Sequence, residues 1–131
     1  MASRVAPHLM FDGVAEEAMN LYVSLFADSE ILEVNKYGAE GPGPEGTIMV
    51  ARFAVAGREF QCADSPMKQD FSFTPSMSIF VDCESQEELD AAFEKLAADG
   101  QVLMPLENYG FSTRFGWVND RFGVSWQLNL P

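Results

Sequence analysis

The end of this chain alternates strictly between apolar and polar side chains. The apolar members are Val124, Trp126, Leu128 and Leu130, and the polar members between them are Ser125, Gln127 and Asn129. Successive side chains of a β-strand point to opposite faces, so the pattern predicts a strand with one buried and one polar face. Turn-forming residues lie just before it, from Asp120 to Gly123. The chain from Ser112 onward therefore predicts a strand, a tight turn and a second strand.

The same order of elements is predicted twice. Periodicity predicts a strand over residues 5–11, a helix over 14–26 and strands over 30–37, 47–55 and 58–63. A second series follows, with a strand over 77–83, a helix ending near 99, a strand over 101–106 and the C-terminal pair. We expect Asp12 or Gly13 to cap the first helix, Ser85 and Glu88 to form a capping box on the second, and Gly100 to end it.

The duplication predicts one domain, residues 1–131, made of two modules. The first module covers about residues 5–63, a linker covers 64–75, and the second module covers about 76–130. A module of about 60 residues does not easily bury a sheet face and a helix stripe alone. The predicted fold class is α+β, with two βαβββ modules forming a curved, half-open mixed sheet and the helices outside. The linker is expected to hold three apolar anchors, Met67, Phe71 and Phe73.

Charge narrows the range of partners. The chain has 20 Asp and Glu against 8 Lys and Arg, a formal net charge of -12. This balance disfavours nucleic acid and anionic membrane surfaces, both of which attract clustered Lys and Arg. No stretch approaches the ~20 apolar residues of a membrane span, and no signal peptide is apparent, so a cytoplasmic location is expected. Cys62 and Cys83 lack a CxxC spacing and are expected to be free, half-buried thiols.

Several stretches carry a resemblance to a known family. They are Phe11 to Ala18, Leu21-Tyr22, Asp64-Ser65-Pro66, Phe80 to Cys83 and Gly116 to Gln127. Together with the paired modules, they resemble the vicinal oxygen chelate superfamily (glyoxalase I, extradiol dioxygenases and bleomycin-resistance proteins), and within it the PhnB-like, demethylubiquinone methyltransferase-like branch. The resemblance implies a homodimer, with swapping of modules as an alternative. It implies no particular activity, and the chain lacks the glycine-rich strand-to-helix turn that would hold an adenosyl cofactor.

Metal-using relatives in that superfamily hold a divalent ion with side chains from the first and last strands of each module. The matching positions here are His8, Gln61, Ser78 (or Ser76) and Gln127, with Pro7 as an alternative to His8. Firm metal sites use imidazole, thiolate or carboxylate ligands, and this set offers one imidazole and two neutral amides. We therefore expect no strong metal site. If a divalent metal is weakly held, the expected ligands are His8, Gln61 and Gln127.

The polar strand faces are the candidate ligand-binding surface. Its expected members are His8, Gln61, Ser78, Phe80, Tyr109, Gln127 and Asn129, with Phe111 as a further aromatic wall, whereas Trp117 and Trp126 are expected in the core. Aromatic rings beside amides and hydroxyls suit a small, partly aromatic ligand. The leading hypothesis is thus a small-molecule-binding protein, and whether it is an enzyme stays open. The alternatives are a metal-dependent isomerase, lyase or dioxygenase acting on a vicinally oxygenated molecule, and an interaction module that assembles through sheet edges or by swapping at residues 64–75.

Overall fold

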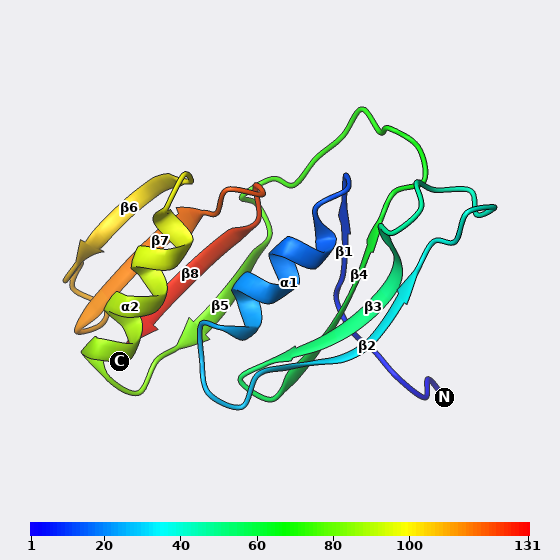
Figure 1. Ribbon diagram of the computed structural model, residues 1–131. Coiled ribbons are helices and arrows are strands. Elements are labelled where there is room, and N and C mark those ends of the chain that lie inside the picture. The colour runs from blue at the N-terminus through cyan, green and yellow to red at the C-terminus, as the bar shows by residue number, and fades with distance from the viewer. The chain divides into compact units, whose positions relative to one another are not determined.

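The computed structural model describes residues 1–131, which form two α-helices and eight β-strands (Figure 1). Hydrogen bonds group the strands into two four-stranded sheets, and the chain divides into two compact units, residues 1–70 and 71–131. Each unit contains one helix and one open mixed sheet, in the order strand, helix, strand, strand, strand. The α+β class with duplicated βαβββ modules is confirmed.

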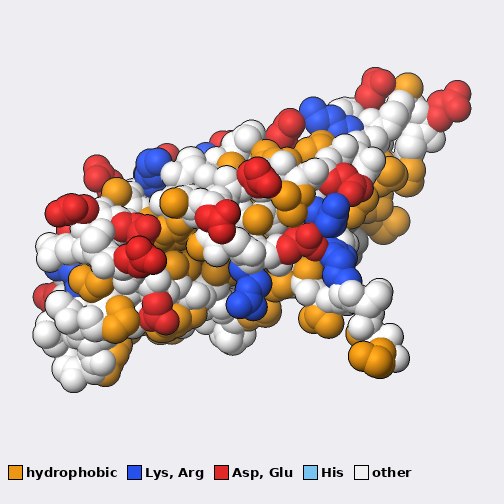
Figure 2. Space-filling model, turned by 90° about the horizontal axis from the view of Figure 1, so that it is seen from below, with side chains coloured by type: hydrophobic (Ala, Val, Ile, Leu, Met, Phe, Trp, Pro, Cys, Tyr) orange, Lys and Arg blue, Asp and Glu red, His pale blue; other side chains and the backbone are white.

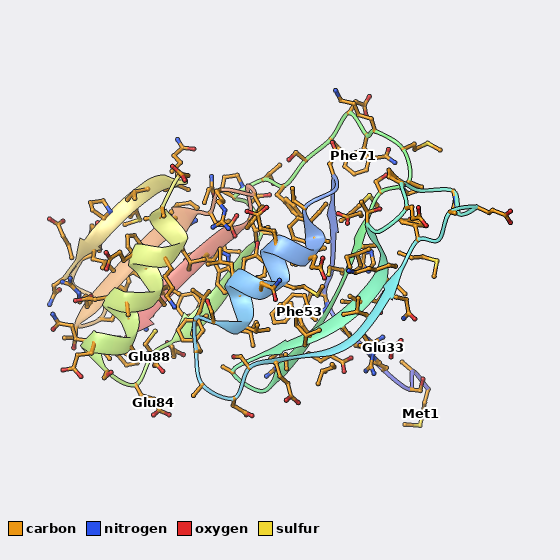
Figure 3. All side chains as sticks on the ribbon, viewed as in Figure 1. Met1, Glu33, Phe53, Phe71, Glu84 and Glu88 are labelled. Carbon is orange, nitrogen blue, oxygen red and sulfur yellow. The ribbon has the colours of Figure 1, made fainter.

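The first unit packs α1 against one face of a sheet whose strand order is β1-β4-β3-β2 (Figure 1). Its elements are β1 (His8–Phe11), α1 (Ala15–Val23), β2 (Glu30–Lys36), β3 (Ile48–Val55) and β4 (Arg58–Asp64). Strand β1 runs parallel to β4, and the other neighbours are antiparallel. Phe53 lies between β3 and α1 (Figure 3), with its ring centroid 6.1 Å from that of Tyr22. Both side chains are fully buried, so this contact is at the centre of the core.

The second unit repeats this arrangement with the strand order β5-β8-β7-β6. Its elements are β5 (Ser78–Asp82), α2 (Gln86–Ala97), β6 (Gln101–Glu107), β7 (Arg114–Asn119) and β8 (Ser125–Leu130). Trp126 is fully buried and is the register partner of Val118. Gly116 lies two positions before Val118, and a Cβ added to it would lie 2.5 Å from the Phe93 ring of α2. Gln127 lies on the opposite face and is partly exposed. The predicted parity of the last strand is confirmed.

The first helix is capped by a residue far away in the sequence. Neither Asp12 nor Gly13 caps it, so that prediction is wrong: Val14 holds the N-cap position and makes no side-chain bond. Instead, the Asp64 carboxylate accepts the Ala15 N–H through Oδ1 at 3.0 Å. Its Oδ2 accepts the Ile48 N–H at 2.9 Å. The parallel pairing of β1 and β4 carries the end of β4 to the start of α1, which local sequence does not reveal.

The second helix follows its predicted start but not its predicted end. Ser85 Oγ accepts the Glu88 N–H at 3.1 Å, and the Glu88 carboxylate accepts the Glu84 N–H at 2.9 Å, so these two glutamates lie together at the start of α2 (Figure 3). Gly100 is not the left-handed residue after the helix; Asp99 takes that role with φ 58°. Gly100 is required for another reason, because an added Cβ would overlap the Asn119 carbonyl oxygen.

The segment between the modules differs from the expectation of three apolar anchors. Met67 and Phe71 are 68% and 63% exposed, and only Phe73 is partly buried. The prediction is therefore wrong for two of the three residues, which lie outside the cores of both units. Neither helix has the length and apolar character needed to cross a membrane.

Candidate ligand-binding faces

All seven predicted site residues lie on the sheet faces opposite the helices. We call these surfaces the first open face, carrying His8 and Gln61, and the second open face, carrying Ser78, Phe80, Gln127 and Asn129. Tyr109, in the loop after β6, reaches the second open face through its edge-on contact with Phe115. The parity of the strands therefore sorts the predicted residues into one pair and one group of five.

On the first open face, His8 and Gln61 meet side by side. They are register partners on parallel strands, and His8 Nδ1 lies 2.9 Å from Gln61 Nε2. The Gln61 side-chain oxygen accepts a hydrogen bond from the Arg4 guanidinium at 3.2 Å. This oxygen is the atom through which Gln61 would bind a metal, and it already faces a positive charge.

Beside this pair, side chains of opposite charge alternate along the first open face. Arg4 contacts Glu59, which also contacts Arg52 at 2.8 Å, and Arg52 contacts Glu33 at 3.1 Å. A hydrogen bond from Asn35 and then the Arg52 guanidinium lower the pKa of Glu33, and the hydrogen bond from Arg4 is the main cause of a lowered pKa at Glu59. These carboxylates are therefore neutralised by cations rather than available for a ligand.

The donor set does not fit a tightly held metal. No three His, Cys, Asp or Glu side chains are placed to hold an ion. Gln61 is engaged by Arg4 and His8, and the Gln127 amide nitrogen donates to Ser78 Oγ at 3.1 Å. Three predicted ligands thus contribute one imidazole and two neutral amides, which do not offset the desolvation of a dication.

Hydroxyl and amide groups on the second open face bond to one another. Ser78 Oγ and Ser125 Oγ lie 2.7 Å apart, and Trp117 Nε1 donates to Ser125 Oγ at 2.8 Å. Trp117 is partly exposed on this face, so its predicted place in the core is wrong, whereas that of Trp126 is confirmed. The register of the β7–β8 hairpin could have predicted this placement, because Trp117 pairs with Gln127 of the polar face across the turn.

A second polar group lies at the other end of these strands. Asn129 Nδ2 donates to Asp82 Oδ1 at 2.9 Å, and Ser112 Oγ donates to Asn129 Oδ1 at 2.5 Å. Asp82 is exposed at the end of β5, and its hydrogen bond holds Asn129 in place. The predicted ligand-binding residue Asn129 therefore has a fixed orientation.

Four aromatic rings cluster beside these polar groups. Phe115 is buried at the centre, 5.1 Å from Phe111, 6.2 Å from Tyr109 and 6.4 Å from Phe80 between ring centroids. Phe80 and Phe111 remain 55% and 64% exposed. Sequence reasoning missed Phe115, although the same hairpin register pairs it with Asn129. Desolvation and then the Glu107 carboxylate raise the pKa of Tyr109, whose hydroxyl donates to the Pro105 carbonyl at 2.6 Å.

Both cysteines are free thiols and are fully buried rather than half-buried. Desolvation, followed by the negative charge of Asp64, raises the pKa of Cys62 to about 12. Desolvation, with smaller contributions from Glu88 and Asp82, raises the pKa of Cys83 to about 12. A neutral, buried thiol is a poor nucleophile and a poor metal ligand, so neither cysteine belongs to the candidate site.

The buried thiols predict a loss of stability in alkali. The unfolded thiols ionise near pH 9.0, whereas the folded thiols keep their protons to about pH 12, so the unfolded state binds fewer protons between these values. The free energy of unfolding should therefore fall as pH rises through this window. Urea unfolding at about pH 8 and about pH 10.5 measures the fall, which should be smaller in the Cys62→Ala, Cys83→Ala variant. An equal fall in both proteins would contradict the prediction.

The fold and the comparisons agree on a class of protein. A mutant of the FosX fosfomycin-resistance protein of Listeria monocytogenes, crystallised with Mn(II) and a dihydroxypropylphosphonic acid, shares the fold, with a TM-score of 0.64 at 13% identity over 100% of this chain and 94% of that one. Paired βαβββ modules with helices on one face of each sheet define a protein of the vicinal oxygen chelate fold.

Residues 3–129 match the 3-demethylubiquinone-9 3-methyltransferase family. The PhnB protein from Bacillus cereus is 53% identical over 98% of this chain and 100% of its own, with a TM-score of 0.96. Protein YjdN of Escherichia coli is 29% identical over 66% of this chain, and the matched part spans 58% of YjdN. The chain belongs to the 3-demethylubiquinone-9 3-methyltransferase family, in the PhnB-like branch of the vicinal oxygen chelate superfamily.

The family description implies a methyl donor, and the residues here do not fit an adenosyl cofactor. Such cofactors are commonly held where a glycine-rich turn joins a parallel strand to a helix with free N-terminal amides. Here Asp12-Gly13-Val14 joins β1 to α1, and the Ala15 amide is taken by Asp64. At α2, Ser85 takes the Glu88 amide. Neither helix start offers a cradle for an adenosyl group.

Proposed function

We propose that this protein binds a small, partly aromatic molecule on the second open face, without a tightly held metal. The observation that carries the proposal is the exposure of Phe80 and Phe111 beside polar groups already ordered by hydrogen bonds. Exposed rings of this size next to oriented amides are typical of ligand sites rather than of solvated surface. His8 and Gln61 are proposed as ligand contacts of the first open face taken by itself.

A flat neutral molecule tests the aromatic part of the proposal. Acridine should bind the wild-type chain and quench Trp117 fluorescence, because its rings can stack on Phe80 and Phe111. The Phe80→Ala, Phe111→Ala variant should bind acridine about tenfold more weakly. An aromatic pair contributes ~0.5–1.5 kcal/mol beyond its buried area, and the variant also loses buried apolar surface. The matched control is Val102→Ala, which removes an exposed apolar side chain whose partner Val118 lies on the helix side of the same sheet. Equal loss in the control, or no binding to wild type, would overturn the proposal.

A second candidate is a metal-assisted enzyme, favoured by the meeting of His8 and Gln61 at 2.9 Å. Equilibrium dialysis against Mn²⁺, Ni²⁺ and Zn²⁺ separates the two candidates. We expect no stoichiometric uptake at micromolar metal, because the Gln61 oxygen already accepts from Arg4. Stoichiometric uptake that disappears in the His8→Ala, Gln127→Ala variant would favour the enzyme, acting on a vicinally oxygenated molecule, and would refute the metal-free proposal.

We also propose a homodimer, with swapping at residues 64–75 as one route to it. Support comes from Met67 and Phe71, which are largely exposed and would be covered by a partner chain. Light scattering of the purified chain measures the mass directly. A monomer at high concentration would count against the dimer and leave the proposed ligand site unaffected.

A further inference from the structure

The second open face carries an acidic side chain on each of its two edge strands. Strand pairing aligns one row of side chains across the sheet, from Asp82 on β5 through Asn129 and Phe115 to Glu107 on β6. The buried ring at the centre of the aromatic cluster therefore lies in the same row as a carboxylate on each edge strand. Asp82 and Glu107 are both exposed, and neither forms an ion pair.

The basic residues of this unit lie elsewhere. Residues 71–131 contain nine Asp and Glu but only three Lys and Arg. Lys95 is on α2. Arg114 points to the helix side of the sheet and contacts Asp90 of α2 at 2.7 Å. Arg121 lies in the turn between β7 and β8, with its guanidinium over the Phe122 ring. None of these three cations is in the row from Asp82 to Glu107, in contrast to the first open face, where Arg4 and Arg52 contact Glu59 and Glu33.

This arrangement favours one charge type in a ligand. The negative faces of aromatic rings attract cations, and this attraction adds to the stacking that a neutral ring would gain. Carboxylates on both sides add attraction for a cation and repel an anion by the same Coulomb term. On the side of the protein seen in Figure 2, acidic side chains are scattered among hydrophobic ones and do not form one large patch.

From these observations, and resting on the function proposed above, we infer that the ligand of the second open face is a flat organic cation, stacked on Phe80 and Phe111 with its positive charge between Asp82 and Glu107. The occupant is a small molecule rather than a second copy of this chain, because the dimer proposed above is supported by Met67 and Phe71 of the segment 64–75 and not by residues of this face.

Three probes that share the acridine ring system and differ in charge test the inference: N-methylacridinium, acridine at a pH where it is neutral, and acridine-9-carboxylate. Titration of each into the full chain, followed by Trp fluorescence, should give an affinity about tenfold higher for the cation than for neutral acridine, and weaker binding for the anion. The advantage of the cation should shrink as NaCl is raised, because salt screens exposed charges.

Matched variants locate the charge. The Asp82→Asn, Glu107→Gln variant keeps an acceptor for Asn129 and should lose most of the preference for N-methylacridinium over acridine. The control, Glu87→Gln, Glu94→Gln, changes the net charge equally on the exposed side of α2 and should keep the preference. Both double variants should have the same circular dichroism spectrum as the wild-type chain.

The possible results distinguish a failure of this inference from a failure of the proposed function. If acridine binds in a Phe80-dependent way and the cation binds no tighter, the ligand class is wrong and the proposed function stands. If the helix control loses the preference as fully as the face variant, the effect is net charge and the inference is again overturned. If no probe binds and Phe80→Ala changes the mass measured by light scattering, a second copy covers the face, and both proposals fall.

Discussion

Replacing Asp64 by alanine should lower the free energy of unfolding by about 3–5 kcal/mol, a large share of the ~5–15 kcal/mol that holds a domain together. The carboxylate is almost fully buried, with 2% of its surface exposed. It accepts the Ala15 N–H and the Ile48 N–H, so its loss leaves two main-chain donors without these partners. Each buried donor left unpaired costs about 1–3 kcal/mol, and one of the two is the first amide of α1, so this sum already includes the lost helix cap.

Urea unfolding followed by far-UV circular dichroism measures the effect, and Asp12→Ala is the matched control. Asp12 is the exposed aspartate three positions before the first residue of α1; the sequence offers it or Gly13 as the cap, and the structure uses neither. Its removal should change the free energy of unfolding by less than about 0.5 kcal/mol. The expectation fails if Asp12→Ala destabilises as much as Asp64→Ala, since the cap would then be local.

Replacing Trp126 by alanine should cost about 3–5 kcal/mol, the usual range for removing a large aromatic side chain from a core. Trp126 has no exposed surface, and its indole Nε1 donates to the buried Asp120 carboxylate at 3.0 Å. Asp120 Oδ1 also accepts the N–H groups of Phe122 and Val124, which shapes the turn before β8. The substitution therefore empties the core beneath α2 and removes one donor from a turn-forming carboxylate.

The other tryptophan provides the comparison. Trp117 is on the opposite face of the same sheet and is partly exposed, so Trp117→Ala should cost about 1–2 kcal/mol, near the lower end for a half-buried side chain. Chemical denaturation of both variants under one set of conditions gives the two values. A greater loss at Trp117 than at Trp126 would show that the face assignment of β7 and β8 is inverted, and the second open face would no longer be a candidate site.

Much of the candidate site followed from strand parity. Strict alternation in the last strand placed Trp126 and Gln127 on opposite faces, and the structure agrees because side-chain period in a strand does not depend on distant contacts. Hairpin register would have added Trp117 and Phe115, which pair with Gln127 and Asn129. The alternation in β7 is obscured by Gly116, where close packing of Phe93 excludes a side chain.

The sequence by itself determined the duplicated order of elements, the α+β class, the start of α2 and the polar face of β8, because each depends on periodicity or on residues within one turn. Tertiary structure alone decided that Asp64 caps α1 across 49 positions, that Gly100 is needed for close approach, that Arg4 engages Gln61 and that Glu107 joins the row of Asp82. These depend on which strands become neighbours and in which register. Pairing brings distant backbone and charged groups within bonding distance, and no local pattern encodes that proximity.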